Sequence, residues 1–570
     1  MRAARTLGRL AAWGLVPLAL GAALVSWRAL RASADLALGR ERLLAGDVRS
    51  ARAAFARSEG WPGTRAAARA GRVAAGARDG RAAAEAVTPD LLAPLDPEAL
   101  VLSALDEGRL DAAAAVADLA RRAGQPVGDL YAAALALEQG DEAAARSILV
   151  GSAVPLASRG LGVRLEQALA ALEAGRRTLL VDRHGELLAT VAPGEGPAVQ
   201  AGLAPLLAGV LERLPVLPEG DAVRLSVDLS LSRAALEALA GHRGSIVLVE
   251  PATGAVLAAV SDERTAAAER TAAFTQQLEP ASIAKLLTAA AAYRAGIDPD
   301  AAIGRMTCTG VERYGGRPLW CPWPAGPLLG LDHALAVSCN IAFANLGVRV
   351  GTDGLVEEYR RWGFDAGAGT LLGTAGRLRS RPRTPLELAH LSIGLDLAEL
   401  TPLHAALIAA TVANDGRLEE PRLVTGTCGP LGLADSPLPR PPGRAVLEPA
   451  VARRLLQAMR SVAERGTGEG LAPAPFPVGI KTGTGAEPGR GYHVNYVGAG
   501  PLPGLAIAFC VRVTHGSSSP AVTRAAHEVA GRLLAALSDR RHLLSLPSRR
   551  PSRAWTRRPG EHFAPARRPR

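Results

Sequence analysis

The spacing of hydrophobic and polar residues divides the chain into stretches that predict different kinds of structure. Residues 35–176 are rich in Ala, Leu, Arg and Glu, and small apolar residues recur there at helical spacing. A Gly followed by a charged residue recurs in this stretch roughly every 30 residues, close to the repeat length of paired-helix solenoids. We therefore predict an all-helical, tetratricopeptide-like region at 35–176, with a plain helical bundle as the alternative.

A β-rich pattern replaces the helical one in residues 177–240. The segment TLLVDRHGELLATVAPG contains two short apolar runs on either side of His184-Gly185, which is typical of two strands joined by a turn. We predict a β-rich linker for this range.

Strands and Ala/Leu-rich helices alternate through residues 241–540. At the start of this range, SIVLVEPATGAVLAAVS has two apolar runs separated by turn residues, which predicts a hairpin. We predict one large α/β catalytic domain here. The final stretch, 541–570, is rich in Pro and Arg and is predicted to be a disordered basic tail.

An uncharged apolar run, Leu10–Trp27, is long enough to cross a bilayer as one helix. Arginines stand on both sides of the run, with a slight excess before it, so the positive-inside bias is small. We predict a cytoplasmic tip and transmembrane anchor at 1–34. The chain would then be a single-pass protein of the cytoplasmic (inner) membrane, with its catalytic domain extracytoplasmic or periplasmic. The alternative is a signal peptide cleaved at Ala32-Ser33-Ala34.

The composition of the chain excludes some classes of protein. Of 570 residues, 48% are hydrophobic, which excludes a disordered polymer. The net charge of +11 is concentrated at the two ends of the chain, so the central part is slightly acidic. A nucleic-acid binder normally carries its basic residues on a folded face, and we therefore predict no nucleic-acid partner.

The chain has five cysteines. Cys308 and Cys321 flank a Gly/Pro-rich segment, CTGVERYGGRPLWC, and are a candidate disulfide, which would be consistent with an oxidising compartment. The alternative is a pair of buried thiols. No Cys/His spacing resembles a zinc site, so we predict no metal, and no cofactor is expected.

Only two of the 65 basic side chains are lysines, Lys285 and Lys481. Lysine can shed its proton, whereas arginine cannot. Ser282 and Lys285 lie at positions i and i+3 of a predicted helix that follows Pro280, so they share one helical face. This is the arrangement that a serine nucleophile with an amine base requires. The alternative is an N-capping serine beside a solvated lysine.

The second lysine opens the segment Lys481-Thr482-Gly483-Thr484, after an apolar lead-in. The pattern predicts a strand whose glycines let another backbone approach closely, and the alternative is a Gly-rich turn with an exposed lysine. Between the two lysines lies Ser338-Cys339-Asn340. The three elements, in this order, are the signature of penicillin-binding proteins and serine β-lactamases.

From about Thr178 to Ser538 the sequence resembles the linker and transpeptidase domain of class B penicillin-binding proteins. Four further stretches carry the resemblance: VDRHGELLAT, GSIVLVEPATGAVLAAVS, SIGLDLAELTPLHAALIAATVANDGRLEEPRLV and GYHVNYVGAGP. The resemblance implies a serine β-lactamase/transpeptidase-like α/β (α+β) fold, with an antiparallel sheet flanked by helices and a helical subdomain. The sequence departs from the family at EPAS, where Glu-Pro-Gly-Ser is more usual.

The resemblance also implies roles for the residues that match. Ser282 would attack the penultimate D-Ala carbonyl of a peptidoglycan stem peptide, and Lys285 would take its proton. Ser338 would relay a proton to the leaving D-Ala, and Asn340 would hold Lys285 and the substrate amide. Lys481 would assist Ser338 and help to bind the terminal carboxylate.

The remaining roles belong to the segment after Lys481. Thr482 and Thr484 would bind the terminal carboxylate, with Gly483 between them. The backbone N–H groups of Ser282 and Thr484 would form the oxyanion hole.

We therefore predict a membrane-anchored D,D-transpeptidase that cross-links peptidoglycan stem peptides and binds penicillin covalently. The alternatives are a D,D-carboxypeptidase, a β-lactamase, or a non-catalytic β-lactam sensor or scaffold. The predicted partners are stem peptides, β-lactams and the membrane, with protein partners possible through residues 35–176.

Overall fold

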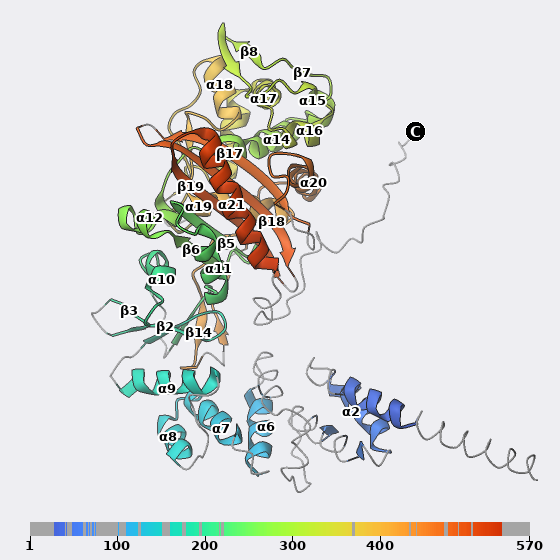
Figure 1. Cartoon of the computed structure of the whole chain (residues 1–570), viewed down its shortest axis with the longest axis vertical. Helices are drawn as coiled ribbons and strands as arrows, with labels where there is room; N and C mark the ends of the chain where they lie inside the picture. The colour runs from blue at the N-terminus through green and yellow to red at the C-terminus, as the bar shows by residue number, and fades with distance from the viewer. Residues whose placement is uncertain are drawn as a thin grey trace, which may run out of the picture.

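The computed structural model describes residues 28–538 except for several gaps, of which 76–100, 102–109 and 151–159 are the longest. Figure 1 shows a helical region, a six-stranded sheet beside it, and a larger domain built on a five-stranded sheet. In these described residues no helix is both long and apolar enough to span a membrane. The predicted anchor segment Leu10–Trp27 and the predicted tail 541–570 lie outside the described residues.

Helices make up the part of 35–176 that the structure describes, as the periodicity predicts. Their core is formed by small residues together with Phe55, Leu130 and Tyr131, and it continues onto Leu179 and Val181 of the neighbouring sheet. The named helices are α2 (Val48–Glu59), α6 (Leu110–Arg122), α7 (Val127–Glu138), α8 (Glu142–Val150) and α9 (Gly160–Glu173).

The six-stranded sheet contains the predicted linker strands. Its order is β15 (Asp435–Pro437), β14 (Val424–Cys428), β4 (Ala222–Leu225), β1 (Thr178–Val181), β2 (Leu187–Val191) and β3 (Ala198–Val199). Strands β1 and β2 pair antiparallel around the predicted turn, where Gly185 has φ +85°. The helix α10 (Ala204–Leu211) follows β3 along the chain.

Two features cross the linker boundary predicted at residue 240. Strands β14 and β15 come from the predicted catalytic range, and β14 pairs with β4 of the linker. Conversely, helix α11 (Leu229–Leu239) lies in the predicted linker range but packs on the five-stranded sheet. The reason is that a helix or strand joins whichever apolar face it completes, and sequence order does not determine that choice.

The five-stranded sheet is the framework of the larger domain. Its order is β17 (Gly479–Glu487), β18 (Gly491–Leu502), β19 (Leu505–Gly516), β5 (Gly244–Val249) and β6 (Val256–Ser261), and every neighbouring pair is antiparallel. The predicted hairpin is confirmed as β5 and β6.

Both faces of this sheet are covered because side chains of a strand alternate between them. In β5, Ile246 and Leu248 pack with α11 and with α21 (Ser519–Ser538), whereas Val247 and Val249 pack with the core that contains α19 (Pro402–Ala413). Figure 1 shows α21 lying across the sheet.

A helical subdomain stands beside the edge strand β17. Its central helix, α14 (Ala284–Arg294), is Ala-rich and buried along most of its length, so neighbouring helices approach it closely. The surrounding helices are α15 (Pro299–Ile303), α16 (Leu331–Ala336), α17 (Asn340–Arg361), α18 (Pro385–Ser392) and α20 (Pro449–Arg465). The predicted flanked antiparallel sheet with a helical subdomain is thus what the structure shows.

Candidate active site

The predicted nucleophile, Ser282, lies in a tight turn that opens α14. Pro280 precedes a short 3-10 helix, η2 (Ala281–Ile283), which continues directly into α14. Ala281 has φ +47°, a left-handed conformation that is unfavourable for a residue with a Cβ. This is the EPAS position where the family more usually has Gly, so the departure leaves the turn in place at a cost in backbone strain.

Gly394 supports this turn from the opposite side. Its carbonyl oxygen accepts a hydrogen bond from the Ala281 N–H at 2.9 Å. Gly394 has φ +77°, and a Cβ there would overlap the Ala281 carbonyl oxygen and lie 2.7 Å from the Ala284 Cβ. The position therefore requires glycine for both conformation and space.

Replacing Gly394 by Ala should displace the turn that carries Ser282. We expect a loss of about 2–4 kcal/mol in the free energy of unfolding, from the left-handed conformation and the overlap together. We also expect acylation by a β-lactam to slow by about 10- to 100-fold, because reactivity is sensitive to small displacements of the attacking group. Denaturant melts and stopped-flow acylation would measure the two effects.

Gly296→Ala is the matched control for that substitution. Gly296 has φ +73°, but a Cβ added there would meet no other atom within 4 Å, so it shares the backbone conformation without the overlap. It should lose some stability and keep the wild-type acylation rate. Equal acylation rates for the two variants would show that the Gly394 contact does not position Ser282.

Lys285 is the centre of the hydrogen-bond network. Its Nζ lies 2.9 Å from the Ser282 Oγ, 2.8 Å from the Asn340 Oδ1, and 3.1 and 2.7 Å from the Oγ and the backbone oxygen of Ser338. The side chain is fully buried. The predicted sharing of one helical face by Ser282 and Lys285 is therefore confirmed, and the solvated-lysine alternative is wrong.

Lys481 contacts the same hydrogen-bond network from the other side, at Ser338. Its Nζ donates to the Ser338 Oγ at 3.0 Å and to the backbone oxygen of Thr482 at 2.7 Å, and its side chain is also fully buried. The Ser338 hydroxyl thus lies between two amines. Ser338 has φ +53°, a strained conformation that turns its side chain and its carbonyl toward Lys285.

Burial determines the protonation of both amines. Loss of hydration lowers the pKa of the Lys285 ammonium to about 7. Burial, and then the nearby charge of Lys285, lower the pKa of Lys481 well below its usual value. A substantial fraction of Lys285 is therefore a neutral amine near pH 7, in contact with a serine hydroxyl, which is the state that a general base requires.

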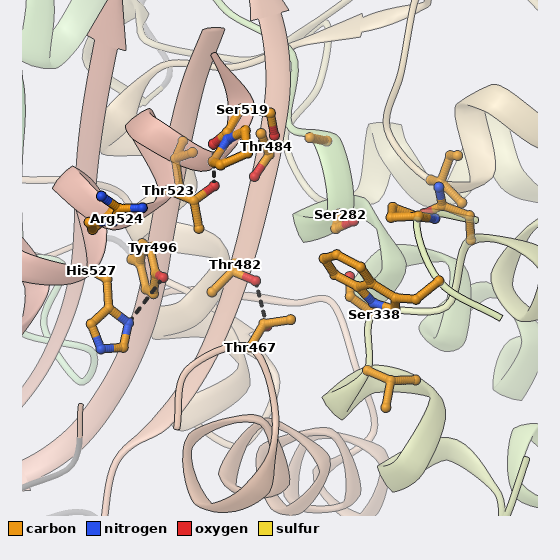
Figure 2. Close-up of a pocket in the computed structure, with 18 of the residues that line it drawn as sticks. Ser282, Ser338, Thr467, Thr482, Thr484, Tyr496, Ser519, Thr523, Arg524 and His527 are labelled. Atoms are coloured by element: carbon orange, nitrogen blue, oxygen red, sulfur yellow. Dashed lines mark hydrogen bonds between the residues drawn. The ribbon is translucent and has the colours of Figure 1, made fainter. Parts of the chain in front are cut away.

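The predicted strand at Lys481 is β17. A Cβ on Gly483 would lie 2.7 Å from the Pro280 carbonyl oxygen, so this glycine lets the turn of the nucleophile approach the strand, as predicted. The Thr482 hydroxyl lies 2.6 Å from that of Thr467, and Thr482 and Thr484 both line the cleft beside Ser282. Figure 2 shows the serine and threonine hydroxyls facing this common space.

Asn340 differs in part from its predicted role. Its Oδ1 accepts from Lys285, as the resemblance implies, but its Nδ2 donates to the backbone oxygen of Trp320 at 2.9 Å. The Asn340 side-chain amide, which the resemblance predicts to contact the substrate, is therefore hydrogen-bonded to the protein itself in this structure.

The disulfide predicted between Cys308 and Cys321 is not formed in the structure, where both are free, buried thiols. The loop spacing did not take into account a third cysteine, Cys339, which lies beside the same pair. The Cys339 sulfur lies 4.0 Å from the Cys321 sulfur, and the three sulfurs are all within 4.8 Å of one another.

The cleft extends beyond the residues of the three motifs. It has a volume of about 800 Å³ and extends from Ser282 over β17 and β18 to one side of α21. Figure 2 shows Tyr496, Arg524 and His527 at the end distant from Ser282. The sequence analysis did not single out these residues, nor Thr467 and Trp323. Tyr496 lies in the stretch GYHVNYVGAGP and Thr467 in a Gly-Thr-Gly, whereas Trp323, Arg524 and His527 have no local signal.

Comparison with known proteins agrees with this geometry. Residues 244–537 match the family model described as penicillin binding protein transpeptidase domain. The chain is 30% identical over 348 residues to the peptidoglycan D,D-transpeptidase PbpA of Mycolicibacterium smegmatis, covering 54% of this chain and 70% of that protein.

Solved structures share the fold. The D,D-transpeptidase domain of a peptidoglycan glycosyltransferase from Eggerthella lenta has 23% identity and a TM-score of 0.54, over 63% of this chain and 98% of that domain. Penicillin-binding protein A from M. tuberculosis, as its imipenem acyl-enzyme complex, has 25% identity and a TM-score of 0.50, over 62% of this chain and 98% of that one. Since the family model matches more than half of the residues, this chain belongs to the penicillin-binding protein transpeptidase domain family.

Proposed function

We propose that this protein is a serine D,D-transpeptidase that cross-links peptidoglycan stem peptides and is acylated by β-lactams at Ser282. The observation that carries the proposal is the contact of the buried Lys285 amine, with its pKa of about 7, with the Ser282 hydroxyl. The names of the relatives support the substrate, because the M. smegmatis relative is a peptidoglycan D,D-transpeptidase.

Acylation follows from the positions of the two amines. The neutral Lys285 accepts the Ser282 proton as Oγ bonds to the carbonyl carbon of the penultimate D-Ala. The amide bond to the terminal D-Ala then breaks, and its nitrogen takes a proton from the Ser338 hydroxyl, which is resupplied by Lys285 or Lys481. An ester on Ser282 and a free D-Ala result.

The second half-reaction needs an amine in place of water. The amino group of another stem peptide attacks the ester carbonyl, a lysine amine takes its proton, and the Ser282 oxygen leaves and is reprotonated.

Because β17 is an edge strand of its sheet, an extended peptide can lie along it with its carboxylate near Thr482 and Thr484. The backbone N–H groups of Ser282 and Thr484 would donate to the carbonyl oxygen where negative charge develops. Each such donor stabilises the transition state by about 3–4 kcal/mol.

The location and partners of the protein are part of the same proposal. The apolar run Leu10–Trp27 would anchor the chain in the cytoplasmic membrane, with the catalytic domain on the outer side, where the substrate is found. The helical region at 35–176 would dock a protein partner, and its packed helix pairs are compatible with a tetratricopeptide-like arrangement.

Two measurements on the purified chain test this function. A fluorescent penicillin should form a label that survives denaturing electrophoresis. A synthetic peptide ending in D-Ala-D-Ala should then release D-Ala and, with an amine acceptor present, yield the cross-linked product. Release of D-Ala only to water would indicate a carboxypeptidase, and rapid loss of the label a β-lactamase. Absence of any label would overturn the enzymatic proposal and favour a scaffold.

A further inference from the structure

A small pocket, which we call the junction pocket, lies where the six-stranded sheet meets the five-stranded sheet. It has a volume of about 190 Å³, and its lining shares no residue with the catalytic cleft. Backbone hydrogen bonds join the two sheets beside it: the Arg422 N–H donates to the Gly254 oxygen at 2.9 Å, and the Val256 N–H donates to the Arg422 oxygen at 3.0 Å. A ligand in this pocket would therefore contact both sheets.

Three arginines line the junction pocket from the six-stranded sheet. Arg183 lies in the turn between β1 and β2, Arg224 in β4, and Arg422 just before β14. The acid of the lining, Glu250, comes from the turn between β5 and β6, and its carboxylate accepts a hydrogen bond from the Thr253 hydroxyl. The lining thus carries three positive charges and one negative charge.

Arg183 has an unpaired guanidinium nitrogen. Among the residues that the structure describes, its Nη1 is buried without a hydrogen-bond partner, and its side chain forms no ion pair. The nearby Asp228 carboxylate is hydrogen-bonded to the His184 ring instead, at 2.9 Å. Because a buried cation without a hydrogen-bonded counter-charge costs free energy, an anion beside Arg183 would stabilise the folded protein.

Arg422 is in a similar position. Its Nη2 donates to the backbone oxygens of Thr425 and Leu438, both at 3.4 Å, and it forms no ion pair within the described part of the chain. Burial, and then the charge of the neighbouring Arg440, lower the pKa of the Arg422 guanidinium. An anion in the junction pocket would offset the repulsion between these guanidinium groups.

We propose that the junction pocket binds a phosphate dianion, either the free ion or the terminal phosphate of an organic monoester, and that this ligand ties the six-stranded sheet to the catalytic domain. The excess of two positive charges in the lining matches a dianion, whereas a single carboxylate would leave one of them uncompensated. Guanidinium groups also present paired N–H donors whose geometry fits phosphate oxygens. Binding here does not depend on the proposed function, because the pocket shares no residue with the cleft.

Isothermal titration of the full purified chain measures this binding, at about pH 8, where a phosphate monoester is dianionic. The probes are inorganic phosphate, glycerol 3-phosphate, dimethyl phosphate and acetate, compared at equal ionic strength. The first two should bind saturably at one site per chain, and the two monoanions at least about tenfold more weakly. Tighter binding of glycerol 3-phosphate than of inorganic phosphate would identify a monoester as the ligand, and the reverse order would identify the free ion.

Arg183→Gln should weaken phosphate binding by about 10- to 100-fold, as expected for loss of a hydrogen bond between charged groups. It should fold, because it removes no side-chain hydrogen bond of the described structure. Arg349→Gln is the matched control, since Arg349 is an exposed residue of α17 outside the pocket and the same charge is lost. Phosphate should raise the melting temperature of the wild type and of Arg349→Gln, but not that of Arg183→Gln.

Three results would each overturn the proposal: no saturable phosphate binding, equal binding of acetate or dimethyl phosphate, or wild-type phosphate affinity in Arg183→Gln. If Arg183→Gln does not fold, Arg422→Gln takes its place with the same expectation. Penicillin should still label Ser282 in the folded variants, so failure of phosphate binding and failure of the proposed function are read from separate measurements.

Discussion

Ser282→Ala is expected to abolish the covalent penicillin label and to reduce transpeptidation by about 10³- to 10⁶-fold. The Ser282 hydroxyl lies 2.9 Å from the Lys285 amine and lines the cleft, in a position to attack a carbonyl there. Without it the acyl-enzyme cannot form, and what remains is the slow reaction of bound substrate with water. In-gel fluorescence after incubation, and chromatography of the peptide products, measure the two losses.

Loss of folding must be separated from loss of chemistry in that variant. Ser538→Ala is a suitable control, since Ser538 ends α21, away from the cleft, and its hydroxyl donates to the Leu534 backbone oxygen within the same helix. It should label like the wild type. Ser282→Ala should melt within a few degrees of the wild type, because the substitution removes one partly buried hydroxyl. A persistent label on Ser282→Ala would assign the nucleophile to another residue.

Lys285→Arg is expected to lower the acylation rate by about 10²- to 10⁴-fold, although it keeps a positive charge. Arginine cannot release its proton at any physiological pH, so it cannot accept the proton of Ser282. Lys285→Ala should lose a comparable amount, because the missing feature in both is the neutral amine. An Arg variant that kept more than about a tenth of the wild-type rate would show that charge at this position suffices.

The pH dependence of the wild type provides an independent check of the same role. With the pKa of Lys285 lowered to about 7, the amine becomes protonated below that pH and can no longer act as base. The acylation rate should therefore fall about tenfold for each pH unit below 7 and level off above it. A rate that rose as the pH fell would contradict the assignment.

Local spacing was sufficient to predict much of the site. Ser282 and Lys285 are one helical turn apart, so the helix alone brings them together. The hairpin of β5 and β6 and the strand at Lys481 were equally local, since each depends on a short run of apolar residues with turn or glycine signals. The order of the three motifs then identified the family.

Features that depend on long-range packing were not predictable. The 3.0 Å contact between Lys481 and Ser338 joins residues 143 positions apart, so the family resemblance implied it but no local pattern did. The loop spacing suggested Cys321 with Cys308, but the start of α17 places Cys339 beside both of them. Likewise, Arg524 reaches the cleft only because α21 crosses the sheet at that point.

Strand β14 comes much later in the chain than β4, the strand with which it pairs. Thr425 of β14 hydrogen-bonds to Arg224 of β4, which precedes it by 201 positions, so β4 is an open sheet edge until β14 is present to pair with it. An open edge is a template for pairing with other chains. Any expression fragment that stops before residue 424 would leave this edge exposed permanently and is expected to aggregate.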